Sequence, residues 1–144
     1  MSRIKWLERG GIQIPYLTLC LDEKAFFAAM RHAKVERPWL DFMSKGADAT
    51  THSIFDDDGP TICVVCIQRD AHRNNIEDIV GLLAHEAVHV MASMREGCPS
   101  LPFADEEFEA QIVSHITQVL FEDWIRQTGR ARVLPRKRAK KGAK

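Results

Sequence analysis

Apolar residues recur at helical spacing in the middle of the chain, from about 76 to 95. Asn74 or Asn75 can cap this predicted helix, and Gly97 stands where a helix C-terminus favours glycine. We therefore expect one side of the helix to pack in the core and the other side to face a cleft. The apolar arc comprises Ile79, Val80, Leu83, Ala84, Ala87, Val88, Val90, Met91 and Met94. The opposite side comprises Asp78, Leu82, His85, His89, Ser93 and Glu96.

The first half of the chain alternates between strand and helix patterns. The apolar run 12–21 predicts a strand, and Asp22 suits the N-cap of a helix over 23–34 that ends before a proline. Two further strand patterns, 50–55 and 61–68, flank a turn sequence and predict a hairpin. The second of these strands is apolar on both faces, so we expect it inside the sheet.

A second long helix is predicted from about 105 to 128, where Gly129 ends it, after a proline-containing loop. Together the elements predict an α+β fold, with a small sheet packed on two long helices. The chain has 144 residues, of which 45% are hydrophobic and 28% charged, which suits one domain over residues 1–129. We interpret residues 130–144 as a basic, disordered tail.

The tail changes the meaning of the formal net charge of zero. It carries eight Lys or Arg and no acid, which leaves 12 basic and 20 acidic side chains in the rest of the chain. Such a tail predicts weak nucleic-acid contact through phosphates, or simply a solubilising role. No apolar run is long enough to span a membrane, and the first residues lack the pattern of a secretion signal. We therefore expect a cytoplasmic protein with no membrane partner.

Four cysteines in a chain without a secretion signal favour reduced thiols over a disulfide framework. Cys63 and Cys66 have the spacing of a redox or zinc pair, but they lie on a predicted strand. Residues three apart on a strand point to opposite faces, so the two thiols should diverge. We interpret both as structural cysteines of the core.

The helix predicted over 76–95 contains the sequence His85-Glu86-Ala87-Val88-His89, with both histidines on its polar side. Two histidines four residues apart lie about 40° apart on one helix face, so their imidazoles can converge on one cation. Neutral imidazole suits zinc. Glu86 projects about 60° from His89, which lets it take a proton from water beside the metal. The motif predicts a zinc ion held by His85 and His89 with Glu86 as general base, and the alternative is a chance match on a polar face.

A catalytic zinc needs a third protein ligand and leaves the fourth position to water. The stretch Glu107-Phe108-Glu109-Ala110-Gln111 resembles the third-ligand helix of gluzincin peptidases, where an acidic or polar residue follows the ligand glutamate at +4. Some members also have alanine at +3, and here Glu107 has both features, in Ala110 and Gln111. A helical wheel instead turns Glu109 toward the core and puts Glu107 on the polar edge. We predict Glu107 as the third ligand, with Glu109 as the alternative.

The histidine motif followed by an acidic, aromatic and alanine-containing helix is also similar to small, mostly uncharacterised metallopeptidases of phage and prophage genomes. The resemblance covers about Thr61 to Trp124 and departs at Gln111, where such sequences often have an aromatic residue. It implies a single zincin-like minimal metalloprotease domain, with HExxH on the active-site helix and the third ligand on the C-terminal helix. For a phage-encoded protein, the expected location is the cytoplasm of the host cell.

Motif and resemblance together predict a zinc-dependent metallopeptidase that hydrolyses peptide or protein substrates with a zinc-bound water activated by Glu86. His52, His72 and His115 are candidates for the oxyanion stabiliser, although each is more simply interpreted as an ordinary histidine. The second hypothesis is a non-catalytic zincin-like binding or phage assembly protein with a structural or vestigial zinc. Glu86 favours the enzyme, because a purely structural site has no need of a base.

Overall fold

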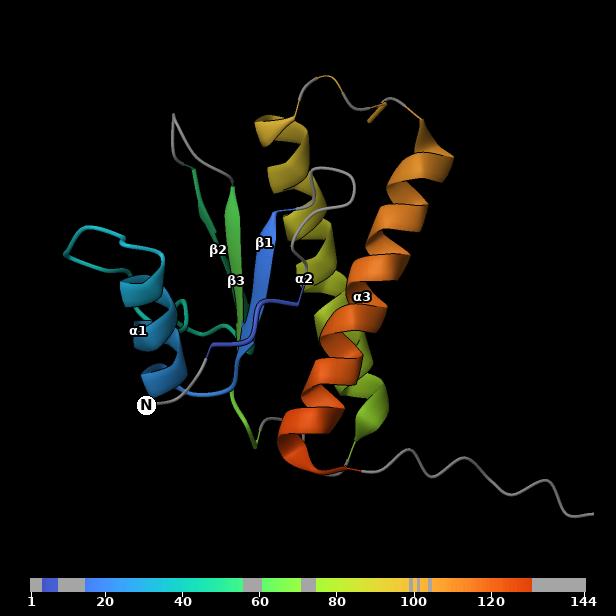
Figure 1. The fold of residues 1–144 in the computed structure, drawn as a ribbon. Coiled ribbons are helices and arrows are strands. Elements are labelled where there is room, and N and C mark those ends of the chain that lie inside the picture. The colour runs from blue at the N-terminus through green and yellow to red at the C-terminus, as the bar shows by residue number, and fades with distance from the viewer. Residues whose placement is uncertain are drawn as a thin grey trace, which may run out of the picture.

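The computed structural model describes residues 4–7, 15–55, 61–70, 75–98, 100, 102–103 and 105–130. Within these ranges the chain forms a small α+β fold, as predicted, and α1 covers one face of the sheet while α2 and α3 cover the other (Figure 1). The predicted tail over 130–144 lies outside the described residues except for Arg130. The strands are β1 (Tyr16–Cys20), β2 (Ala49–Ile54) and β3 (Ile62–Ile67), and the helices are α1 (Glu23–His32), α2 (Ile76–Gly97) and α3 (Glu106–Thr128).

The strand β3 lies at the centre of the sheet, which has the order β1-β3-β2. It runs parallel to β1 and antiparallel to β2, so the predicted hairpin is confirmed in its strand pairing, although its turn over 56–60 lies outside the described residues. The central position also confirms the prediction made from its two apolar faces. It follows that β2 is an edge strand, paired on one side within the described sheet.

Alternate residues of the strands enter two separate hydrophobic cores. Cys63 and Val65 of β3 pack on the side of α2 and α3, whereas Val64 and Cys66 pack under α1. The prediction that the two thiols diverge is therefore confirmed. On the neighbouring β2, Ala49 joins the core under α2, and the same alternation turns the other odd-numbered residues of this strand toward that helix.

The start of α1 and the end of α3 follow the capping signals of the sequence, whereas Asn75 at the N-cap of α2 makes no side-chain capping hydrogen bond. The Asp22 side chain accepts a hydrogen bond from the Ala25 backbone N–H at 2.7 Å, as expected for the N-cap of α1. Gly129 adopts a φ of 69° and ends α3, a left-handed conformation that favours glycine. The helix α1 ends at His32, two residues earlier than predicted, and Lys34 follows it with a φ of 57°.

The buried side of α2 differs in part from the predicted apolar arc. Val88 is 46% exposed, so its assignment to the core was wrong, while Glu86 and Ser93 on the polar side are buried. The reason is that α2 packs against the edge strand β2 as well as against α3, and β2 covers the polar positions that face it. The remaining buried residues of the arc are Ile79, Leu83, Ala87, Val90, Met91 and Met94.

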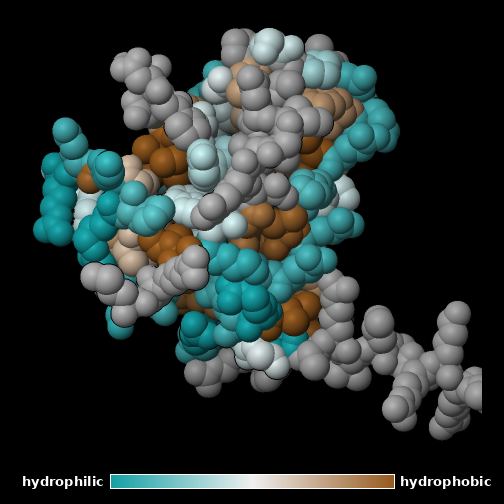
Figure 2. All heavy atoms as spheres, viewed as in Figure 1, coloured by the Kyte–Doolittle hydropathy of each residue, from teal (hydrophilic) through white to brown (hydrophobic). Residues whose placement is uncertain are grey.

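Figure 2 shows mostly hydrophilic atoms over the outer sides of α1 and α3, with hydrophobic atoms appearing between these two flanks. This distribution agrees with the two cores on either side of the sheet. None of the described helices combines the length and the apolar character that crossing a bilayer requires.

Candidate metal centre

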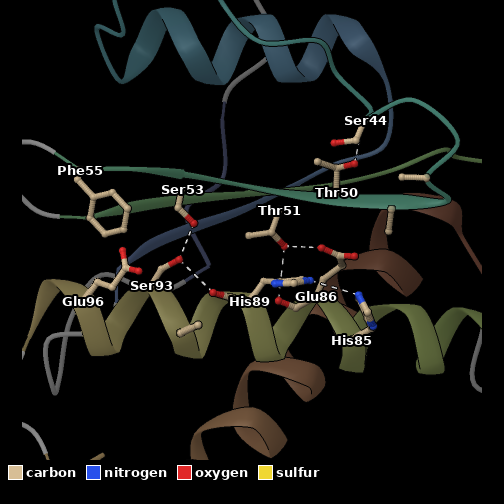
Figure 3. A pocket seen from close by; sticks show the side chains of 13 residues that line it. Ser44, Thr50, Thr51, Ser53, Phe55, His85, Glu86, His89, Ser93 and Glu96 are labelled. Atoms are coloured by element: carbon tan, nitrogen blue, oxygen red, sulfur yellow. Dashed lines mark hydrogen bonds between the residues drawn. The ribbon is translucent and has the colours of Figure 1, made fainter.

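The imidazoles of His85 and His89 converge one turn apart on the exposed side of α2 (Figure 3). Their Nε2 atoms are 3.2 Å apart, and the rings meet at an interplanar angle of 71°. Two nitrogens bound at about 2.0–2.1 Å to one tetrahedral zinc ion lie about 3.3 Å apart. The pair therefore presents two donors at the spacing that a single zinc ion requires, a spacing that also suits a hydrogen bond between two neutral imidazoles.

The carboxylate of Glu86 lies between α2 and β2, beside the histidine pair (Figure 3). The residue is only 3% exposed, and its Oε2 accepts a hydrogen bond of 2.6 Å from the Thr51 hydroxyl. A buried carboxylate is costly unless it has such a partner. The arrangement keeps an acid–base group next to the two exposed nitrogen donors.

A hollow of about 420 Å³ opens between α2 and β2 at this point. It is lined by the histidine pair and Glu86, and by small hydroxyl residues of β2. One turn beyond His89, the Ser93 hydroxyl donates to the His89 carbonyl oxygen at 3.0 Å and hydrogen-bonds the Ser53 hydroxyl of β2. These contacts join the helix to the edge strand along one wall of the hollow.

A second hollow of about 560 Å³ continues past the histidines along the N-terminal half of α2. The two hollows share His85 and Glu86 in their linings, so they adjoin each other beside the helix, and together they are called the groove. The predicted polar side of α2 lines this groove, with Asp78 and Leu82 in one part and Ser93 and Glu96 in the other. Asp48 and Glu77 add further carboxylates to the second part.

Glu107 lies in the first turn of α3, away from the groove. Its Oε1 accepts a hydrogen bond of 3.2 Å from the Gln111 side chain, and both residues line a separate hollow of about 350 Å³ together with Ser114 and Gln118. Glu109 instead forms an ion pair with Arg95 of α2, and its side chain is 25% exposed. The helical wheel is thus confirmed, because Glu109 turns toward α2 and Glu107 occupies the polar edge.

The structure brings His85, Glu86 and His89 together but does not bring Glu107 or Glu109 to them. No group of three or more His, Cys, Asp and Glu is placed to hold a metal ion among the residues that the structure describes. The ion pair between Arg95 and Glu109 places the first turn of α3 beside the last turn of α2, and Arg95 lies six residues, or about 9 Å of helix, past His89. Glu107 as the third ligand stays a prediction.

The histidines suggested as oxyanion stabilisers do not line the groove where the structure describes them. His52 is 7% exposed and faces α1, with its Nε2 3.1 Å from the Phe42 carbonyl oxygen and its ring against Phe26. It therefore lies on the opposite face of the sheet from the histidine pair. His115 lines the separate hollow on α3 with Glu107, and His72 lies outside the described residues.

The sequence interpretation missed the two hydroxyl residues of β2 that contact α2, Thr51 and Ser53. The available signal is the alternation of the strand, which puts both on the same face as Ala49 and opposite to His52. That signal gives the shared face but not the helix residue that each one meets.

The buried thiols on β3 should be chemically inert in the folded protein. Burial raises the pKa of Cys63 to about 11, and hydrogen bonds with Ser53 and Ser93 offset part of the rise. Burial also raises the pKa of Cys66, and the neighbouring Cys20 and Glu86 raise it further. Because the thiolate is the reactive form, both thiols stay protonated and unreactive at pH values well below these raised pKa values.

We expect iodoacetamide at pH 7.5 to leave Cys63 and Cys66 unmodified in the native protein and to alkylate both after denaturation. Peptide mass spectrometry of the two samples measures this difference directly. Rapid alkylation of either residue without denaturant would contradict the buried arrangement of β3.

No family model, no curated protein and no solved structure matches this chain. The functional conclusion therefore depends on the histidine motif and on the geometry around it.

Proposed function

We propose that the chain is a zinc-dependent metallopeptidase built as a small zincin-like domain. His85 and His89 hold the zinc ion, and Glu86 is the general base. The observation that supports the proposal most is the approach of the two Nε2 atoms to 3.2 Å beside a buried carboxylate. A structural zinc site with two histidine ligands needs nitrogen donors at this spacing, but it does not need an acid–base group held next to them.

Zinc, when bound, supplies a Lewis acid that acidifies a coordinated water and polarises a carbonyl oxygen. Glu86 then accepts the proton of the attacking water and passes it to the leaving amine. The two histidines would hold the ion, and both lie on the exposed side of α2 in the lining of the groove. The residues of the chain thus supply the metal donors, the base and the binding surface.

The groove favours an extended peptide or an unfolded protein segment as the substrate. It runs along α2 next to β2, and β2 has one edge unpaired within the described sheet, whereas the central β3 is paired on both sides. Extended peptides add to such edges through main-chain hydrogen bonds. We therefore propose that the substrate contacts β2, the strand beside the groove.

The third ligand remains the predicted Glu107, with Glu109 as the alternative. Bringing either carboxylate to the histidine pair requires the start of α3 to shift along α2 toward His89. The alternative hypothesis drawn from the sequence is kept as a second candidate function. In that alternative the chain is a non-catalytic zincin-like binding or assembly protein with a structural or vestigial zinc.

Metal removal tests the proposal directly. We expect the wild-type protein to carry about one zinc ion per chain and to cleave a fluorescently labelled unfolded protein. Treatment with phenanthroline should abolish cleavage, because the Lewis acid is removed, and added zinc should restore it. Elemental analysis and fluorescence release measure the two properties.

Two outcomes would contradict this expectation in different ways. Cleavage that is unchanged by removal of the metal would exclude a zinc-dependent mechanism. A zinc-loaded protein that cleaves none of a broad set of unfolded proteins would instead support the non-catalytic alternative.

A further inference from the structure

Thr51 occupies a rigid position on the sheet. It lies in the middle of β2, directly opposite Val65 of the central strand β3. The Val65 side chain is fully buried. A β-branched side chain has few rotamers, so its hydroxyl has a well-defined direction. Alternation along the strand turns that hydroxyl toward α2, as Figure 3 shows.

The hydroxyl of Thr51 meets the carboxylate of Glu86, a residue 35 positions later in the chain. The distance to Oε2 is 2.6 Å, whereas the distance to the Glu86 main-chain oxygen is 3.5 Å. The single proton of the hydroxyl therefore goes to the carboxylate. A hydrogen bond to an ionised acceptor is about twice as strong as a bond between neutral groups.

We propose that Thr51 is a positioning residue, which fixes the Glu86 carboxylate in the orientation that proton transfer needs. The inference rests on the proposed peptidase function and names a residue on which that function depends. A glutamate side chain is long and flexible. A hydrogen bond to a rigid strand restricts its conformations in advance, so less conformational entropy has to be lost when the carboxylate is aligned for proton transfer. With Oε2 anchored by the hydroxyl, Oε1 is the oxygen that receives the proton.

A purely structural role for Thr51 gives different expectations. A hydroxyl that only compensates the burial of a carboxylate would, when removed, lower the stability of the protein and its zinc content together. A positioning role predicts a loss in kcat with the zinc content and KM preserved, because ground-state binding does not depend on the orientation of the base.

The test is the variant Thr51→Val, which removes the hydroxyl and nearly preserves the shape of the side chain. We expect kcat on an unfolded protein substrate to fall about 10- to 100-fold, with KM within about twofold and one zinc per chain. Thr51→Ser keeps the hydroxyl and should return kcat to within about threefold of the wild type. Thr51→Ala gives the same comparison if the valine variant does not fold.

A second measurement does not depend on activity. The side-chain ¹³Cδ resonance of Glu86, recorded for the metal-free protein at one fixed pH, should move in Thr51→Val and stay near its wild-type position in Thr51→Ser. Thr117→Val is the matched control, because it removes a hydroxyl that donates to the Val113 carbonyl oxygen at 2.7 Å on α3, away from the groove. This control should change neither kcat nor the resonance.

The possible results distinguish a failure of the positioning role of Thr51 from a failure of the proposed peptidase function. An active wild type with an unaffected Thr51→Val, or a loss confined to zinc content or KM, would overturn the positioning role alone. A wild type that cleaves nothing would overturn the proposed function, and the positioning role with it.

Discussion

Glu86→Gln is expected to keep one zinc ion per chain and to lose about 10²- to 10⁴-fold in kcat. The amide has nearly the same size as the carboxylate, and its oxygen can still accept the hydrogen bond from Thr51, so the packing between α2 and β2 should persist. An amide cannot take a proton from water at neutral pH. The change therefore removes the chemistry and leaves the metal donors in place.

The measurement compares zinc content by elemental analysis with kcat on an unfolded protein substrate. Glu23→Gln is a matched control, because this glutamate lies in the first turn of α1, on the other face of the sheet. Equal cleavage by wild type and Glu86→Gln would remove Glu86 from the mechanism. Loss of zinc from Glu86→Gln would instead assign the carboxylate to the metal.

His89→Ala is expected to weaken zinc binding by more than about 100-fold, because it removes one of the two converging nitrogen donors. The side chain is exposed, so the thermal midpoint of the metal-free protein should change little. Competition with a chromogenic chelator measures the zinc affinity, and circular dichroism measures the folding. His32→Ala on α1 is the control, and stoichiometric zinc of wild-type affinity in His89→Ala would eliminate the proposed site.

The same competition assay decides the third ligand. Glu107→Ala should weaken zinc binding by at least about tenfold while Glu109→Ala does not, if the predicted ligand is correct. The reverse order would assign the ligand to Glu109, whose ion pair with Arg95 would then have to open. Wild-type affinity in both variants would leave the histidine pair without either acid and favour the non-catalytic alternative.

The order and type of the elements could be predicted from the sequence because their signals are local. An aspartate cap, a left-handed glycine and a strand that is apolar on both faces each act within a few residues, at Asp22, Gly129 and β3. The histidine pair belongs to the same group, since four residues of helix are enough to make two imidazoles converge.

The rest of the site depends on packing that no local pattern encodes. The contact between Thr51 and Glu86 requires β2 to dock on α2, and the same docking buries Ser93. The position of Glu107 depends on how far α3 is displaced along α2, which the intervening loop and the shared core decide together. The resemblance to a family pattern selected Glu107 as the third ligand. The offset between α2 and α3 determines whether its carboxylate can reach the histidine pair.

The histidine pair and the Glu86 carboxylate therefore depend on the tertiary structure to different degrees. The histidines are four residues apart on one helix, whereas the base is held by a contact across 35 residues. Under the proposed function, the part of the zinc affinity that comes from the histidine pair needs only the helix α2, whereas turnover also needs the sheet that aligns Glu86. On gradual heating, turnover should therefore be lost before the two histidines cease to bind zinc.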